Sequence, residues 1–195
     1  INEMSADPLP VDIARPHMWL QPTTAREPNG KEFDLPRYER HLLCDEDGMF
    51  PNNPGSTWEP AVLTAELQRK GSVGWYRNPD RASQDSLGVI YEEAGENRIL
   101  RPDFIFFARL DDGTIVADII DPHGIHLADA LPKLKGLARY AEANAASYRR
   151  IEAVAKIDEN YRLLDLKEGN VRAAVEAATS ARSLYSSEAG KDYVL

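Results

Sequence analysis

The stretch PDFIFFARLDDGTIVADIIDPHG, residues 102–124, predicts the centre of the fold. It contains two almost wholly apolar segments, 104–110 and 114–120, joined by Asp111-Asp112-Gly113. Apolar runs of this length with a short Asp/Gly connection are typical of a β-hairpin. Because both faces of each predicted strand are apolar, we expect a sheet that is covered on both sides.

The length of the loop determines how the two strands face each other. If residues 111–113 form a three-residue loop closed by a left-handed glycine, the strands pair so that Asp103 opposes Asp121. Opposed residues point to the same side of a sheet and side chains alternate, so Asp103, Asp121 and His123 would share one face. A two-residue loop would shift the register by one and put the two aspartates on opposite faces.

Two carboxylates at the end of a buried sheet need compensation, because opposed like charges are destabilising and burial raises the cost. Mg²⁺ is commonly held by one or two protein carboxylates together with substrate phosphates, and a bound ion activates water for attack on a phosphodiester. Asp103 and Asp121 therefore indicate a metal site for phosphate chemistry. The spacing Asp121-x-His123-x-x-His126 could recruit Mn²⁺ or Zn²⁺ instead. Alternatively, both aspartates only make hydrogen bonds at turns and strand ends.

Periodic apolar residues on either side of the hairpin predict further elements. We expect a helix at 59–70, strands at 73–77 and 87–92, a helix from Leu127 to Ala145, a hairpin at 150–157 and 161–166, and a helix at 168–178. This order predicts an α/β domain with a mixed central sheet flanked by helices.

Proline is concentrated at one end of the chain. Nine of the 13 prolines lie in the first sixty residues. Proline lacks a backbone donor and fixes φ, so this part should hold no long helix or central strand. We expect a Pro-rich extension at 1–57 with an ordered patch at 38–50, an α/β domain at 58–178 and a C-terminal tail at 179–195.

The composition excludes several classes of protein. The 195 residues include 43% hydrophobic residues and carry a net charge of −9, which is globular in character and unlike a free-standing polyanion binder. No apolar run is long enough to span a membrane, and the first residues do not resemble a signal peptide. The single cysteine, Cys44, fits a reducing cytoplasm, where we expect the protein to lie. The initial Ile suggests a piece of a longer polypeptide.

Pro102-Asp103 followed by Asp121-Pro122-His123 resembles the PD-(D/E)xK nuclease motif, with His123 where a lysine usually stands. Together with Trp75-Tyr76-Arg77-Asn78, the run from 58 to 157 is similar to the C-terminal endonuclease domain of type III restriction-enzyme Res subunits and related DEAD/DEAH helicase-nucleases. The resemblance implies a restriction-endonuclease-like fold and Mg²⁺-dependent hydrolysis of DNA in a restriction or phage-defence system. It also implies a helicase/ATPase domain on the same or a partner polypeptide.

The resemblance assigns roles to particular residues. Asp103 and Asp121 would be metal ligands and catalytic residues, joined by an acidic residue from the preceding helix. Glu59 and Glu66 both qualify because they are seven apart on one helical face, and we prefer Glu66 because it lies nearer the strand.

The missing lysine leaves alternatives open. His123 or a migrated Lys133 would support the attacking water and the charge on the phosphate, while Arg77 and Asn78 would contact DNA. A second hypothesis is a catalytically degenerate nuclease fold that positions DNA or binds a subunit. A third, an α/β sandwich unrelated to nucleases, requires the two aspartates to be far apart.

Overall fold

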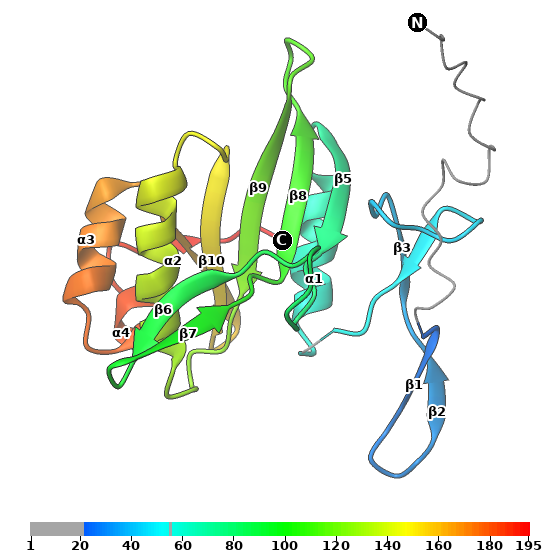
Figure 1. Cartoon of the computed structure of the whole chain (residues 1–195), viewed down its shortest axis with the longest axis horizontal. Coiled ribbons are helices and arrows are strands. Elements are labelled where there is room, and N and C mark those ends of the chain that lie inside the picture. Colours follow the sequence, from blue (N-terminus) through cyan, green and yellow to red (C-terminus); the bar gives the residue numbers. More distant parts are fainter. Residues whose placement is uncertain (1–21, 55) are drawn as a thin grey trace, which may run out of the picture. The chain divides into compact units, whose positions relative to one another are not determined.

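The concentration of proline predicted a boundary near residue 57 between an extension and an α/β domain. The computed structural model divides the chain into two units, 1–53 and 54–195. The structure describes residues 22–54 and 56–195 (Figure 1). The second unit contains the predicted α/β domain, and each unit is described below by itself.

The described part of the first unit contains two short hairpins. Their strands are β1 Thr24–Arg26 with β2 Glu32–Asp34, and β3 Arg37–Glu39 with β4 Met49–Pro51. Strands of three residues suit a segment in which prolines interrupt the backbone donors. The predicted ordered patch at 38–50 corresponds to the second hairpin, whereas the first hairpin was not predicted.

A six-stranded sheet forms the centre of the second unit, in the order β12-β11-β10-β9-β8-β5 (Figure 1). The strands are β5 Ser72–Arg77, β8 Phe104–Arg109, β9 Ile115–Pro122, β10 Arg150–Ile157, β11 Asn160–Asp165 and β12 Lys191–Asp192. Strands β9 and β10 are parallel and the other neighbours are antiparallel. The prediction of a mixed α/β sheet is therefore confirmed.

The predicted register of the central hairpin is also confirmed. Phe104 pairs with Ile120, and Arg109 pairs with Ile115. The Leu110 N–H donates to the Thr114 carbonyl at 2.9 Å, and Gly113 adopts a φ of +87° in the loop. The three-residue loop needs this left-handed glycine, so the turn chemistry sets the pairing of the whole hairpin.

Helices cover both faces of the sheet. They are α1 Glu59–Gln68, α2 Ala130–Asn144, α3 Gly169–Ala177 and α4 Ala181–Tyr185. Helix α2 connects the parallel strands β9 and β10, as a parallel pair requires a crossover. Ile119 of β9 packs in the core with α2, α3 and α4, while its neighbour Asp118 is linked to α1 through Arg150. Because side chains alternate along a strand, α1 and α2 lie on opposite faces.

A separate hairpin packs on α2. It consists of β6 Val89–Glu93 and β7 Glu96–Leu100. Gly136 of α2 allows the close approach, because a Cβ there would lie 2.4 Å from Tyr91 Cβ and 2.9 Å from the Ile90 carbonyl oxygen. The first strand was predicted, but its partner was missed because its residues are mostly polar and exposed.

The prediction of a C-terminal tail at 179–195 is wrong. Helix α4 packs in this segment and β12 joins the edge of the sheet beside β11. Tyr185 is fully buried, and the Tyr193 N–H donates to the Tyr161 carbonyl at 2.9 Å. These elements are five and two residues long, too short to give a periodic pattern in the sequence.

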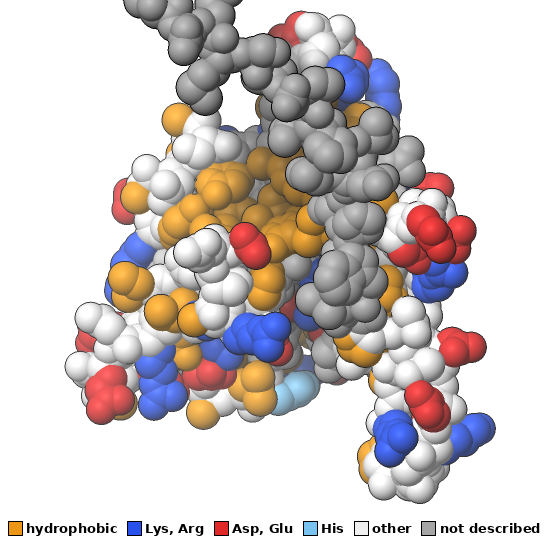
Figure 2. All heavy atoms as spheres, turned by 45° about the vertical axis from the view of Figure 1, so that its right-hand side comes forward, with side chains coloured by type: hydrophobic (Ala, Val, Ile, Leu, Met, Phe, Trp, Pro, Cys, Tyr) orange, Lys and Arg blue, Asp and Glu red, His pale blue; other side chains and the backbone are white. Residues whose placement is uncertain are grey.

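Hydrophobic residues are not wholly enclosed in the second unit. Val73, Ile90, Ile99 and Ile115 remain at least 40% exposed, and Figure 2 shows hydrophobic side chains gathered on one side of the molecule. Among the described helices, none has the length and apolar composition needed to cross a membrane.

Candidate functional site

Asp103 and Asp121 lie together where β8 begins and β9 ends. The Asp103 backbone N–H donates to Asp121 Oδ1 at 3.1 Å, and the Asn78 N–H donates to the Asp103 carbonyl at 2.9 Å. The ends of β5, β8 and β9 are thereby joined around two carboxylates. The structure brings together the residues that the hairpin register paired.

Arg77 links these aspartates to the start of α1. Its Nη2 lies 3.0 Å from Asp103 Oδ1, and its Nη1 lies 3.2 Å from Glu59 Oε2. The guanidinium carbon also sits 4.8 Å from the centre of the Phe104 ring. Arg77 was predicted to contact DNA, but these contacts direct its guanidinium toward the acidic residues of the site.

The acidic residues outnumber the cations that contact them. Burial raises the pKa of Asp103 to about 8, and the charges of Asp121 and Glu59 add to the rise, while Arg77 and Lys133 oppose it. One arginine therefore does not compensate the carboxylates around it. Without a further cation, burial and the neighbouring carboxylates disfavour the ionised form of Asp103.

A cavity of about 190 Å³ opens beside the aspartates and is also lined by His123 and Lys133. His123 Nδ1 lies 3.6 Å from Asp121 Oδ2, and its backbone N–H donates to the Val154 carbonyl at 2.8 Å. Its Nε2 is buried and has no hydrogen-bond partner among the described residues. Lys133 Nζ lies 2.7 Å from Asp129. Both candidates for the missing lysine thus lie at the cavity.

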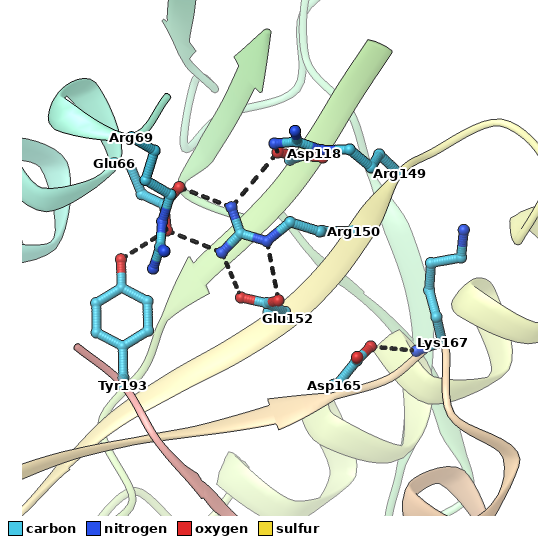
Figure 3. Close-up of polar contacts among 9 residues, drawn as sticks. All are labelled: Glu66, Arg69, Asp118, Arg149, Arg150, Glu152, Asp165, Lys167 and Tyr193. Atoms are coloured by element: carbon cyan, nitrogen blue, oxygen red, sulfur yellow. Dashed lines mark hydrogen bonds and ion pairs between the residues drawn. The ribbon is translucent and has the colours of Figure 1, made fainter. Parts of the chain in front are cut away.

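Glu66 belongs to a different cluster (Figure 3). Oε1 accepts from Arg69 at 2.8 Å, Arg150 at 2.9 Å and the Tyr193 hydroxyl at 2.7 Å, and Oε2 accepts from Arg150 at 2.8 Å. Burial opposes ionisation of Glu66, but Arg150 and Tyr193 hold its pKa below the ordinary value. The preference for Glu66 as a metal ligand is therefore not supported.

Glu59 is the glutamate that reaches the site, although both glutamates share a helical face. Seven residues of α-helix span about 10 Å, so the two lie at opposite ends of α1. Asn78 is only 3% exposed, and its amide donates to the Leu87 carbonyl at 2.9 Å and accepts from the Leu87 N–H at 2.8 Å. His126 is exposed.

The site fits Mg²⁺ better than a metal that needs several protein ligands. Residues 22–54 and 56–195 contain no group of three or more His, Cys, Asp or Glu side chains arranged to hold an ion. Asp103 and Asp121 offer two carboxylates, which is the number of protein ligands that Mg²⁺ commonly takes beside water and phosphate oxygens. Zn²⁺ sites use at least three protein ligands, so zinc does not fit.

Comparison with known proteins identifies the family to which this chain is similar. The YagJ family model matches residues 39–194. Protein YagJ of Escherichia coli K12 is 49% identical over 193 residues, which cover 99% of this chain and 78% of that protein. No solved structure is significantly similar. These names state neither a substrate nor a reaction.

Proposed function

The chain belongs to the YagJ family, and we propose that it is a Mg²⁺-dependent nuclease that hydrolyses DNA phosphodiester bonds at Asp103 and Asp121. The observation that carries the proposal is a pair of carboxylates, the buried Asp121 and the partly buried Asp103, insufficiently compensated, beside a cavity of about 190 Å³. The mixed sheet with helices on both faces agrees with the restriction-endonuclease-like fold that the sequence resemblance implies.

Asp103 and Asp121 would hold the ion, which when bound supplies an activated water and neutralises charge on the phosphate. Arg77 holds one oxygen of Asp103, so it orients this carboxylate. His123 would accept a proton from the water, because its buried Nε2 has no partner among the described residues. Lys133 lines the same cavity and would support the negative charge that develops on the phosphate.

Cleavage assays with matched variants test this proposal. The double variant Asp103→Asn/Asp121→Asn should lose Mg²⁺- or Mn²⁺-dependent cleavage of plasmid and single-stranded circular DNA while remaining folded by circular dichroism. Asp111→Asn is the control, because Asp111 lies in the loop at the other end of the same hairpin and is 96% exposed. Equal cleavage by the double variant and the control would refute the site.

We also propose that a helicase/ATPase partner delivers the DNA. The net charge of −9 predicts weak DNA binding that is lost as salt rises. The match leaves about a fifth of the E. coli relative outside it, which is too little for a motor of two ordinary domains. Such a partner would therefore be a separate polypeptide in that relative. Recovery of an ATPase with the tagged, native protein would support the proposal, and its repeated absence would count against it.

The second candidate function is a catalytically degenerate module that positions DNA or a subunit. It is favoured by Arg77, which already provides an internal cation for Asp103 and Glu59, and by histidine in the usual lysine position. Titration calorimetry separates the two functions. Mg²⁺ binding that disappears in Asp103→Asn/Asp121→Asn supports the nuclease, whereas no binding and no cleavage at any metal concentration supports the module.

A further inference from the structure

A second hollow on the α/β unit is lined only by basic side chains. It measures about 490 Å³ and lies between Arg69 and Lys70, after α1, and Arg149 and Arg150, at the start of β10. We refer to it as the basic groove. In a chain with a net charge of −9, four cations around one hollow are a local departure from the overall charge.

Buried carboxylates fix the arginines of the basic groove from beneath (Figure 3). Arg149 binds both oxygens of Asp118, through Nε at 3.0 Å and through Nη2. Arg150 donates hydrogen bonds to Glu66, Glu152 and Asp118. These three acids are at most 6% exposed, so they lie behind the guanidinium groups and restrict their motion. A ligand would meet arginines whose orientation is already set.

Two cations of the basic groove retain binding capacity. Arg149 Nη1 makes no hydrogen bond or ion pair with any residue that the structure describes, and the side chain is 32% exposed. Lys70 is 92% exposed, and its only described ion pair is with Asp111, 3.5 Å away and 96% exposed. An exposed pair of this kind contributes little and exchanges readily. Both groups can therefore turn to an anion without disrupting the buried cluster.

A further hollow meets the basic groove at Arg149 and carries aromatic surface on the other face of the sheet, because Phe107 pairs with Ala117 and so points away from Asp118. It measures about 580 Å³, shares Arg149 with the groove, and is lined by Phe107, Ile115 and Tyr148 among others. Successive bases of a single strand stack on aromatic side chains while its phosphates follow a positive groove. An acidic peptide would use the cations but would have no need of the aromatic rings.

We propose that Lys70 and Arg149 bind backbone phosphates of a single-stranded nucleic acid that passes around Arg149, so that a base lies against Tyr148 and Phe107 on the other face of the sheet. None of the residues that line the two hollows lines the cavity beside Asp103 and Asp121, so this surface is distinct from the aspartate site. The inference deepens the proposed function by naming a single strand as the partner, but binding without metal does not depend on cleavage.

Fluorescence anisotropy with a labelled 20-nucleotide single strand tests the basic groove in the full chain, with EDTA present. Lys70→Glu should weaken binding about tenfold and reduce the slope of log affinity against log salt by about one, the contribution of one phosphate contact. Lys31→Glu is the matched control, because it makes the same charge change at an exposed site in the first unit. Equal affinities for these two variants would overturn the proposal.

The aromatic contact needs its own measurement. Tyr148→Leu should weaken single-strand binding about fivefold or more and leave duplex binding nearly unchanged, since only unstacked bases reach the ring. Equal loss for both forms of DNA, or equal competition by poly-glutamate and an unlabelled single strand, would overturn the proposal. Asp103→Asn/Asp121→Asn should bind like the wild type in EDTA, so failure of the nuclease and failure of the basic groove are separable.

Discussion

Acidic residues on the two faces of the central sheet have different partners. On the α1 face, Glu66, Asp118 and Glu152 are bound by three arginines, Arg69, Arg149 and Arg150 (Figure 3). On the other face, Asp103 and Asp121 meet at the strand ends, and Arg77 divides its contacts between Asp103 and Glu59.

The two sites differ in how far cations compensate their carboxylates. In the α1-face cluster, arginines match the acids in number, and the pKa of Glu66 is lowered although burial opposes ionisation. At the aspartate site, burial and neighbouring carboxylates raise the pKa of Asp103 to about 8. In the first cluster, arginines compensate the charges of all three carboxylates. The second needs a proton or an added cation, as expected for a binding site.

Breaking the balanced cluster should cause a large loss of stability at any pH at which its carboxylates are ionised. Arg150→Met would leave three buried carboxylates with less compensation, and we expect the free energy of unfolding to fall by about 3–5 kcal/mol. Urea unfolding measures this change. Arg182→Met is the control, because the Arg182–Asp158 pair at 2.7 Å is exposed and should contribute less than about 1 kcal/mol. Similar losses for both variants would contradict the expected difference between the buried cluster and an exposed ion pair.

The next largest effect separates the two candidates for the missing lysine. If Lys133 supports the charge on the phosphate, Lys133→Gln should lower the single-turnover cleavage rate about 100-fold at every pH. If His123 is the general base, His123→Gln should instead remove the pH dependence of the cleavage rate. Lys135→Gln, two residues along the same helix and outside the cavity lining, is the control. Wild-type rates in both test variants would exclude both roles.

The aspartate site should also give stability a distinctive pH dependence. Because folding raises the pKa of Asp103 from 3.8 to about 8, its contribution is fully present below pH 4 and is lost as the pH rises to 8. Metal-free wild type should therefore lose stability relative to Asp103→Asn across this window, by at most about 1.4 kcal/mol per pH unit. Urea unfolding at several pH values measures the difference, and parallel curves would contradict it.

The smallest effect concerns the link between the C-terminal segment and α1. Tyr193→Phe removes the hydroxyl that donates to Glu66 at 2.7 Å but leaves two arginines on that carboxylate. We expect a loss of about 1 kcal/mol in thermal or urea unfolding. Tyr161→Phe is the control, since Tyr161 lies on the neighbouring strand β11. A loss as large as that of Arg150→Met would mean that Tyr193 anchors the whole cluster.

Local sequence was informative where a turn controls the pairing of nearby strands. Asp111-Asp112-Gly113 predicted the register that places Asp103 beside Asp121, because the three-residue loop leaves one pairing of the strands it joins. The choice between Glu59 and Glu66 could not be made in this way. It depends on Arg77 and Arg150, which reach the helix from strands 18 and 84 residues away in the chain.

Some features of this protein therefore follow from local sequence, and others follow from contacts between distant segments. Local sequence patterns predicted the α/β alternation and the proximity of Asp103 and Asp121, because turn chemistry and side-chain periodicity act over a few residues. The packing of distant elements adds α4 and β12 to the domain and places Glu66 in the arginine cluster. It alone brought Arg69 and Lys70 next to Arg149. Such contacts depend on how distant elements pack, and no local pattern encodes that packing.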